Sequence, residues 1–421
     1  MPLSKIKILS VTARYPPYHL GGYEIRCSNI LDELARRGHA ILVITSVKET
    51  ISKSPGRVSK YEIFRKFHIR KHARHFIDEV LIDLQDTAFL DHQIKRFQPD
   101  VIYLGHIQPL SKAIMPYLAG CKIPIVYDEG GSGLIHSWEH KGIWFYFVDE
   151  YVSRYFILNK VKPVVVNMIS RLSGHRIKSK WDWPDSLQVV FNSELNLKNA
   201  ITRGVPVNNA RVIHSGIDTE RFNFVPKTKL GLPLSFIVPG RIEPLKGQLD
   251  AVRLLAALSD CGMDGNMIFI GENYSASFYL EMENEIKKYR LGNKITLMPM
   301  VAQDKLIDLY HLAGICLFPS YHKTGYSRVP LEAMACGCIV FSYGNEGSDE
   351  IIKDGQTGFL FSPDDYSGMI AVVKEMISNP GMVRDVIGNA RRDVEENCSM
   401  EKYVDKMEET VRAAVGAIKL P

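Results

Sequence analysis

Two basic residues that follow a glycine have the types and spacing needed to bind a phosphate group. Arg241 comes directly after Gly240, and Lys246 follows in the same segment, just before a helix predicted from about Leu249. Glycine allows a tight exit from a strand, and the N-terminus of a helix favours an anion. Arginine can chelate a phosphate through its guanidinium group, while lysine adds a point charge. The segment is therefore a candidate diphosphate site, and the alternative is a pair of solvated surface cations.

A polar loop and the short helix after it form a second candidate site. The loop follows an apolar run at 314–318, and the predicted helix carries Glu332. A carboxylate can accept hydrogen bonds from a vicinal diol, such as that of a ribose. The alternative is an ordinary exposed helical glutamate.

The elements that must position these residues alternate between short apolar runs and helical patterns. The apolar runs are 5–12, 40–45, 100–104, 123–127, 187–191, 234–238, 266–270, 295–297, 314–318 and 338–341. Strands that alternate with amphipathic helices predict parallel sheets. We therefore expect an α/β protein with two doubly wound domains, joined between residues 200 and 225. Ligands of such sheets bind beyond the carboxyl ends of the strands, so two facing domains would form one cleft.

Composition excludes several classes of protein. The chain has 421 residues, of which 46% are hydrophobic and 24% charged, so it is neither disordered, collagen-like nor a disulfide scaffold. No apolar run approaches the roughly 18 residues of a spanning helix, and the start does not resemble a signal peptide, so we expect a cytoplasmic protein. The seven cysteines are scattered without a CxxC pair, which favours reduced thiols over a zinc site.

Five segments, in order along the chain, resemble motifs of the retaining glycosyltransferases of family 4, the glycosyl transferases group 1. Residues 240–247 resemble G-R-L-x-x-x-K-G, residues 319–337 resemble P-S…L-E-A-M-A-C-G, and residues 349–360 resemble E-I-V-x-D-G-x-T-G-x-L. Residues 213–218 resemble I-P-N-G-V-D, and residues 21–24 resemble the opening GG loop. The resemblance implies the GT-B fold, in which two Rossmann-like domains face each other across a cleft.

The same resemblance implies a division of the chain. Residues 1–205 would form the N-terminal, acceptor-side domain. Residues 206–399 would form the C-terminal domain that binds the nucleotide-sugar donor. The last helix, in residues 400–421, would cross back to the N-terminal domain.

The resemblance also implies an activity and roles for individual residues. The protein would move a hexose from a nucleotide diphosphate, with UDP-sugars favoured over GDP-mannose, to a glycan, lipid-linked or small-metabolite acceptor, with retention of configuration. Arg241 and Lys246 would bind the diphosphate, Glu332 the ribose, the backbone near Met300 the base, and Gly22 would close on the diphosphate from the other domain. The remaining donor contacts would come from Gly240, Thr324, Gly325, Tyr326, Ser327 and Arg328.

The chemistry implied needs neither a metal nor a cofactor. The sequence has no Asp-x-Asp pair, and two fixed cations with a helix N-terminus can replace a metal at a departing diphosphate. In this family the departing phosphate would take the acceptor proton, so no separate protein base is required.

Two positions depart from the family pattern. Thr324 stands where the family commonly has a first glutamate that contacts the donor sugar, and no carboxylate is adjacent to it. His106 lies one residue later than the family's catalytic-site histidine, after the apolar run at 100–104. We carry His106 as a catalytic and acceptor candidate, and a structural histidine at a strand end is the alternative.

Further acceptor candidates lie in residues 128–156. Asp128 and Glu129 begin a glycine-rich segment that we expect to be a mobile acceptor loop. The aromatic stretch at 142–147, with Tyr151, Tyr155 and Phe156, is either a core-packed helix or an acceptor platform.

Charge differs between the two halves of the chain. The net charge of +5 combines +9 in residues 1–200 with −4 in the remainder, and residues 53–75 contain eight Lys or Arg against a single acid. Phe64 and Phe67 interleave with these cations, which favours an amphipathic segment attracted to an anionic membrane at ~1 kcal/mol per cation. A solvated face is the alternative. The architecture argues against a nucleic-acid partner.

Two other functions remain open at this point. A sugar-nucleotide epimerase on the same fold would form an epimer without any acceptor. A non-catalytic nucleotide-sugar-binding protein would bind the donor without turnover, and Thr324 keeps this alternative open.

Overall fold

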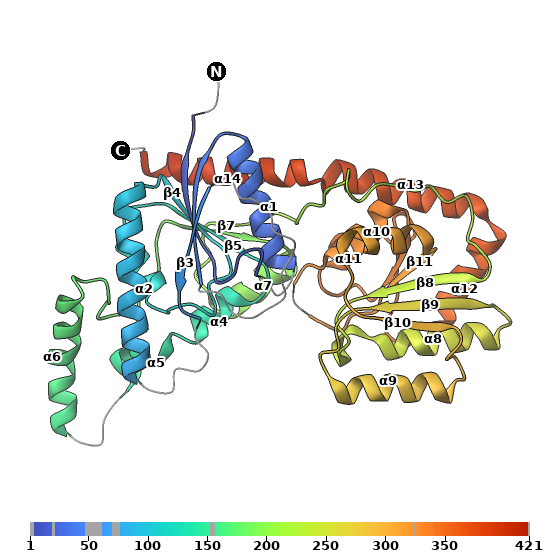
Figure 1. Cartoon of the computed structure of the whole chain (residues 1–421), viewed down its shortest axis with the longest axis horizontal. Coiled ribbons are helices and arrows are strands. Elements are labelled where there is room, and N and C mark those ends of the chain that lie inside the picture. The colour runs from blue at the N-terminus through green and yellow to red at the C-terminus, as the bar shows by residue number, and fades with distance from the viewer. Residues whose placement is uncertain are drawn as a thin grey trace. The chain divides into compact units, whose positions relative to one another are not determined.

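The computed structural model describes residues 4–18, 22–46, 61–69, 76–151, 156–323 and 325–419 of the chain (Figure 1). The chain divides into two compact units. The first runs through Asn192, takes in Asn196–Ile213 and resumes at Val404, and the second comprises Ser193–Leu195 and His214–Tyr403.

The first unit contains a seven-stranded parallel sheet with the strand order β3-β2-β1-β4-β5-β6-β7. Its strands are β1 (Lys7–Val11), β2 (Ala40–Ser46), β3 (Glu62–Phe67), β4 (Val101–Leu104), β5 (Ile125–Glu129), β6 (Leu187–Phe191) and β7 (Ala210–Val212). Its helices are α1 (Gly22–Arg36), α2 (Phe76–Phe97), α3 (Ile114–Ala119), α4 (Gly133–Glu139), α5 (Gly142–Phe145), a π-helical turn (Tyr146–Glu150), α6 (Phe156–Leu172) and α7 (Glu194–Thr202). Because β7 pairs with β6, this unit extends to Ile213, beyond the expected boundary at residue 205.

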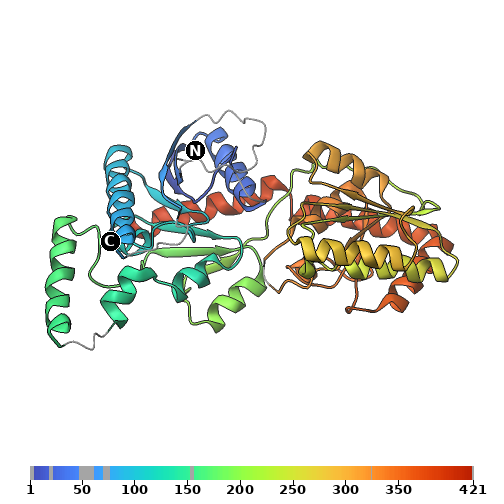
Figure 2. The ribbon, with the colours of Figure 1, turned by 60° about the horizontal axis from the view of Figure 1, so that its bottom comes forward.

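The second unit contains a six-stranded parallel sheet with the order β10-β9-β8-β11-β12-β13. Its strands are β8 (Leu234–Pro239), β9 (Gly265–Ile270), β10 (Ile295–Met298), β11 (Ile315–Phe318), β12 (Ile339–Ser342) and β13 (Phe359–Leu360). Its helices are α8 (Gln248–Asp260), α9 (Ala276–Lys288), α10 (Gln303–Leu312), α11 (Arg328–Cys336), α12 (Tyr366–Ser378) and α13 (Pro380–Asn397), with 3₁₀ turns at Pro244–Lys246 and Ser348–Glu350. Figure 2 shows helices on both faces of each sheet.

The central strands of both sheets are buried on both faces, as their continuous apolar sequences predict. Every residue of β4, β5, β11 and β12 is buried. In the first unit, apolar side chains from alternate positions of the strands form a core that includes Leu9, Ile102 and Val189. In the second unit, two apolar cores pack on the two faces of the sheet. The edge strands, by contrast, are only partly buried.

The aromatic stretch at 142–147 contributes to the core of the first unit. Trp144 and Phe145 are completely buried, and the Trp144 indole N–H donates to the Lys178 carbonyl at 3.1 Å. Tyr146 and Tyr151 are exposed. Of the two interpretations, the core-packed helix is correct for Trp144 and Phe145. Tyr155 lies outside the described residues.

The basic stretch at 53–75 is described only at residues 61–69, where the expected amphipathic segment is instead an edge strand. Glu62–Phe67 form β3 beside β2, and Phe67 is buried in the core. The guanidinium group of Arg65 donates to the carbonyls of Tyr15 and Pro16 at 3.1 and 2.6 Å. The Arg65 side chain thus binds the backbone of the loop after β1. Residues 53–60 and 70–75 lie outside the described residues.

The last helix, α14 (Met400–Lys419), belongs to both units. Its residues from Val404 onward pack in the first unit, where the Glu408 carboxylate accepts from Arg37 at 2.9 Å and contacts His39 at 3.1 Å. Burial alone would raise the pKa of Glu408, but hydrogen bonds from Arg37, Arg412 and His39 outweigh it and lower the pKa to about 2. Among the helices that the structure describes, none combines the length and apolarity needed to cross a bilayer.

Candidate active site

The predicted phosphate-binding segment and the predicted ribose-binding segment meet in the second unit. Strands β8 and β11 are neighbours, and the strand order reverses between them. Residues 240–246 follow the carboxyl end of β8, and residues 319–327 follow that of β11. The crevice at such a reversal is where open α/β sheets bind their ligands.

Gly247 allows these two segments to touch. Its φ of +67° lies in the left-handed region, and a Cβ built on it would lie 2.0 Å from the carbonyl oxygen of Pro319. Any other residue would push the segment after β8 away from the segment after β11. Contact also runs through Tyr321, whose N–H donates to the Leu245 carbonyl at 2.8 Å.

At this edge of the sheet, Lys246 contacts two residues from other parts of the second unit. Its ammonium donates to Glu346 Oε1 at 2.5 Å and lies 5.7 Å from the centre of the Phe318 ring. The hydroxyl of Ser320 donates to the same Glu346 oxygen at 2.8 Å. The Lys246 side chain is only 14% exposed. Sequence reasoning missed Glu346, which follows β12 and lies 100 positions from Lys246 along the chain.

Arg241 joins the same network from its more open side. Its guanidinium group lies 3.0 Å from Glu243 Oε1 and 4.9 Å from the centre of the Tyr274 ring. His322 Nε2 lies 3.2 Å from Glu243 Oε1 and 4.0 Å from Glu346 Oε1. The Arg241 side chain is 48% exposed. The structure therefore brings both predicted cations into one network of charged groups.

Glu332 lies apart from this network, on the buried face of α11. Its carboxylate accepts a hydrogen bond from the Tyr310 hydroxyl at 3.2 Å and lies 3.6 Å from Arg328 Nε. Burial raises the pKa of Glu332, while Arg328 and Tyr310 act in the opposite direction. The alternative of an ordinary exposed helical glutamate is wrong, because Glu332 is buried.

The loop between β11 and α11 leads into the N-terminus of α11. The Ser327 hydroxyl accepts from the Val329 N–H at 3.4 Å, and Gly325 has a φ of +104°. Tyr326 is buried and stacks on the His214 ring at 5.1 Å. Thr324 lies outside the described residues. Met300, the expected base contact, is exposed two residues after β10.

In the first unit, Asp128 forms a buried ion pair at the carboxyl end of β5. Its Oδ1 accepts from Arg26 Nη2 at 2.7 Å, and its Oδ2 accepts from the Tyr103 hydroxyl at 2.6 Å. The side chains of Arg26 and Asp128 are 4% and 1% exposed. This corrects the expectation that Asp128 belongs to a mobile loop. Sequence reasoning missed Arg26 because nothing in its own helix indicates a partner 102 positions away.

Glu129 is also fixed, by the backbone that follows it. Its carboxylate accepts from the N–H groups of Gly131, Gly133 and Leu134 at 2.6, 3.3 and 2.5 Å, at the start of α4. Burial raises the pKa of Glu129, and these three backbone donors oppose that shift. The expected mobile loop is therefore a capped helix start. An acceptor could reach Asp128 or Glu129 only if these contacts opened.

His106 lies where the sequence placed it, just beyond β4. Its Nε2 is 3.4 Å from Gln108 Oε1, and its ring meets the edge of the Tyr23 ring at 5.7 Å. Burial lowers its pKa, which favours the neutral imidazole. The Tyr23 hydroxyl donates to the Asp128 carbonyl, and a Cβ on Gly130 would lie 1.9 Å from the Tyr23 ring. Tyr23 thus links His106 to β5. Gly22 is the first residue of α1.

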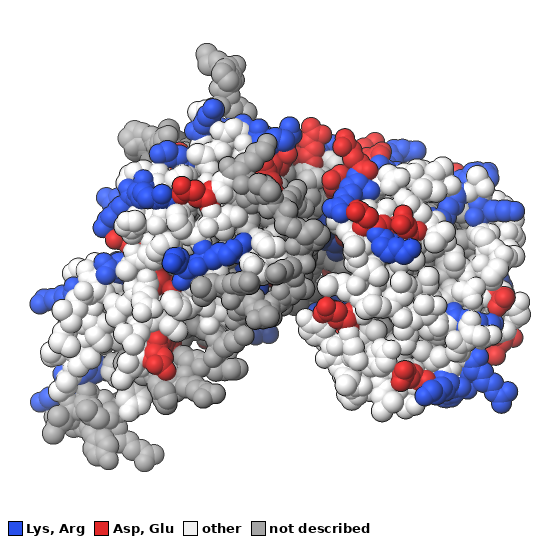
Figure 3. Space-filling model, in the orientation of Figure 1, with Lys and Arg blue, Asp and Glu red and all other residues white. Residues whose placement is uncertain are grey.

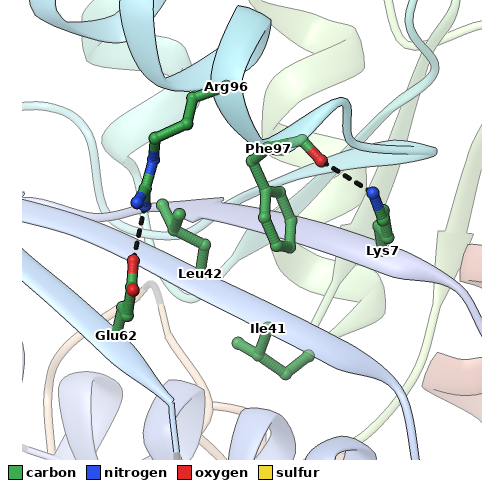
Figure 4. Close-up of a pocket in the computed structure, with 6 residues that line it drawn as sticks. All are labelled: Lys7, Ile41, Leu42, Glu62, Arg96 and Phe97. Carbon is green, nitrogen blue, oxygen red and sulfur yellow. Dashed lines mark hydrogen bonds and ion pairs between the residues drawn. The ribbon is translucent and has the colours of Figure 1, made fainter.

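Two further features do not form a site. The described residues hold no group of three or more His, Cys, Asp or Glu side chains that could bind a metal ion. A small hollow lies at the amino-terminal ends of β1 to β3 (Figure 4). Its polar groups are already paired, since Lys7 donates to the Phe97 carbonyl at 3.1 Å and Arg96 to Glu62 at 2.5 Å. This end of the sheet is opposite to the one where such folds bind ligands.

Two family models together match the chain from residue 20 to residue 393. Residues 20–221 match Glycosyltransferase Family 4, and residues 221–393 match Glycosyl transferases group 1. The chain belongs to the family 4 glycosyltransferases. The resemblance identified from the sequence is confirmed.

The curated relatives that match this chain are distant. Glycogen synthase of Mycobacterium tuberculosis is 27% identical over 169 residues, 40% of each chain. D-inositol 3-phosphate glycosyltransferase of Rhodococcus jostii is 27% identical over 222 residues, 50% of this chain and 49% of that protein. The chain thus spans less than half the length of these two relatives. Sulfoquinovosyl transferase SQD2 of Arabidopsis thaliana is 23% identical over 412 residues, 94% of this chain and 71% of that protein.

Solved structures resemble this chain over nearly its whole length. A glycosyltransferase from Rickettsia africae has a TM-score of 0.70 at 18% identity and covers 98% of this chain and 99% of its own. Anabaena HepE in complex with UDP has a TM-score of 0.68 at 18% identity, covering 97% and 100%. Sucrose-phosphate synthase of Thermosynechococcus elongatus has a TM-score of 0.69 at 17% identity, covering 98% and 100%. With the two parallel sheets, these likenesses confirm the predicted GT-B fold with two Rossmann-like domains.

Proposed function

We propose that this glycosyltransferase moves a hexose from a nucleotide diphosphate donor to a glycan, lipid-linked or small-molecule acceptor, with retention of configuration. UDP-sugars are the favoured donors, with GDP-mannose next. The observation that carries the proposal is the network that holds Lys246 and Arg241 at the carboxyl ends of β8 and β11. The structurally similar HepE was solved with UDP and with UDP-glucose, which supports a UDP-sugar donor.

The chemistry of the proposed reaction follows from these two cations. As the bond between the anomeric carbon and the phosphate oxygen breaks, negative charge grows on the leaving diphosphate. Lys246 and Arg241 stabilise that charge, and the N-terminus of α8 lies directly after Lys246. The acceptor oxygen bonds to the anomeric carbon on the face that the phosphate leaves, and its proton passes to the phosphate. We propose that transfer requires no metal ion, because the two cations supply the positive charge.

Nucleotide binding tests the donor site directly. We expect one of UDP, GDP, ADP and dTDP to bind in calorimetric titrations that contain a chelator, followed by its sugar conjugates. Glu332→Ala should weaken that binding about 10- to 100-fold, because a hydrogen bond to a charged group contributes about 1.5–3 kcal/mol. Glu281→Ala, on the exposed side of α9, is the matched control and should bind like the wild type.

The outcomes of this titration separate the proposed functions. Binding of a nucleotide sugar followed by transfer to an acceptor supports the glycosyltransferase activity. Release of an epimer without acceptor would identify an epimerase, and binding without any turnover would identify a non-catalytic binding protein. Failure of every nucleotide to bind would contradict the donor site itself.

We also propose that α6 contacts an anionic membrane surface. The helix lies at the outer edge of the first unit (Figures 1 and 2). Four apolar side chains on one of its faces are exposed: Val161, Val164, Met168 and Leu172. Val166 and Ser170 on the opposite face are buried. The helix carries Lys160, Lys162 and Arg171 and no acidic residue, and Figure 3 shows Lys and Arg along this edge. An apolar stripe with flanking cations is typical of a helix that lies in the surface of an anionic bilayer.

Vesicle flotation tests the α6 proposal. We expect the protein to float with phosphatidylglycerol vesicles at low salt and to be released at high salt, because each cation near the surface contributes about 1 kcal/mol. The double substitution Val164→Glu and Met168→Glu should abolish flotation. Leu280→Glu, at an exposed apolar position on α9, is the control and should float like the wild type. Unchanged flotation of the double variant would contradict the role of α6. The proposal would also be contradicted if the wild type were a dimer and the double variant a monomer, because the apolar face of α6 would then bind a second copy of the chain.

A further inference from the structure

Glu346 occupies a backbone conformation that ordinarily belongs to glycine. Its φ is +53°, and Gly344 and Gly347 on either side have φ values of +69° and +71°. A glutamate is disfavoured in this left-handed region, and such exceptions tend to lie at functional sites. The turn is fixed from both directions, since the Glu346 N–H donates to the His322 carbonyl at 3.2 Å and its carbonyl accepts from the Ser327 N–H at 2.9 Å.

The two oxygens of the Glu346 carboxylate have different surroundings. Oε1 accepts both from Lys246 at 2.5 Å and from Ser320 at 2.8 Å. Among the described residues, none donates a hydrogen bond to Oε2. Oε2 is nevertheless not fully buried. Oε2 therefore reaches solvent from a residue that is only 7% exposed. An ionised carboxylate has about four acceptor sites, so the one half that faces outward is free to accept from a ligand.

Two other carboxylates at this edge of the sheet are placed differently. Glu243 pairs with Arg241 and contacts His322. Glu332 is buried against Tyr310 and Arg328. Glu346 is the carboxylate that the structure places against the more buried of the two cations proposed to bind the diphosphate.

We propose that Glu346 Oε2 accepts hydrogen bonds from hydroxyl groups of the donor sugar while Oε1 keeps Lys246 aimed at the diphosphate. This inference rests on the proposed donor site. A sugar attached to a phosphate that Lys246 holds lies next to the Lys246–Glu346 pair, so its hydroxyls come within reach of Oε2. A carboxylate suits this task because hydrogen bonds from hydroxyls to an ionised oxygen are short and strong. It also supplies a carboxylate to the site although position 324 is a threonine.

Separate titrations with a nucleotide and with its sugar conjugate test the inference. We expect Glu346→Gln to weaken binding of UDP-glucose or GDP-mannose, whichever the wild type binds, by about tenfold, the loss typical of one charge-assisted hydrogen bond. Binding of free UDP or GDP should be unchanged or tighter, because the substitution removes a negative charge beside the diphosphate. The ratio of the two dissociation constants is therefore the decisive quantity.

Two variants make this measurement robust. Glu346→Gly removes the whole side chain at a backbone conformation that glycine prefers, so it should fold and shift the ratio in the same direction. Glu281→Gln makes the same chemical change on the exposed side of α9 and should leave the ratio unchanged.

The possible results distinguish this inference from the proposed function. Equal weakening of nucleotide and nucleotide sugar in Glu346→Gln would overturn the inference, since the carboxylate would then only order Lys246. The same holds for a ratio that stays at the wild-type value. A wild type that binds neither UDP, GDP nor their sugar conjugates would overturn the proposed donor site, and the inference with it.

Discussion

Replacing Lys246 by alanine is expected to lower kcat by about 10²–10³-fold, the loss seen when one preorganised electrostatic donor is removed from an active site. The reason is that charge on the leaving diphosphate grows in the transition state, so Lys246 binds the transition state more tightly than the ground state. Arg241→Ala should act in the same direction but less strongly, because its side chain is half-exposed whereas that of Lys246 is nearly buried. The measurement is steady-state release of the nucleoside diphosphate.

The Lys246→Ala variant needs a control, because the substitution leaves the Glu346 carboxylate without Lys246. Glu346 would lose its cation in a nearly buried position, which by itself destabilises the site. The double variant Lys246→Ala with Glu346→Gln removes that unpaired charge and should retain the kcat defect relative to Glu346→Gln alone. Lys305→Ala, on the exposed side of α10, should be unaffected. A change confined to the KM of the acceptor would contradict a role for Lys246 at the leaving group.

Asp128→Asn is expected to lower the free energy of unfolding by about 3–5 kcal/mol, the typical loss when one partner of a buried ion pair is removed. Arg26 would remain charged while its side chain is 4% exposed, and it would lose the ion pair with Asp128 at 2.7 Å. Asparagine has nearly the same shape and keeps an oxygen for the Tyr103 hydroxyl, so the loss measures charge rather than packing. Urea unfolding followed by circular dichroism provides the measurement.

An exposed ion pair in the same unit is the matched control. Arg203 and Glu139 lie 2.7 Å apart with side chains that are 60% and 34% exposed, so Glu139→Gln should change stability by less than about 1 kcal/mol. If Asp128→Asn were as stable as the wild type and instead raised the acceptor KM, Asp128 would be the acceptor contact that the sequence suggested. The two outcomes therefore decide between a structural and a binding role for this residue.

The fold and the position of Arg241 and Lys246 beyond β8 were predictable because the signals that specify them are local. Alternating apolar runs and helical patterns indicate parallel sheets, since each strand must be buried on both faces. The spacing from Gly240 to Lys246 is a local pattern as well, because one strand exit and one helix start hold both cations. His106 likewise follows its strand directly.

The structure differs from expectation in segments whose environment is set by distant residues. Glycines after Asp128 and Glu129 suggested mobility, but Arg26 and the start of α4 fix both carboxylates. The interleaved cations and aromatic residues suggested an amphipathic segment, and within its described part backbone pairing with β2 makes Glu62–Phe67 an edge strand. The composition of each segment does not indicate these contacts with distant residues.

The sequence by itself determined the family, the two doubly wound sheets and the cations proposed to bind the donor, because strand burial and motif spacing act over short stretches of chain. Only the tertiary structure decided which carboxylates accompany those cations. Glu346 meets Lys246, and Asp128 meets Arg26, across 100 and 102 positions of chain. The physical reason is that parallel strands bring their carboxyl ends to one edge whatever their separation in sequence. Which side chains meet at the carboxyl ends of the strands depends on the strand order, and no local sequence pattern specifies that order.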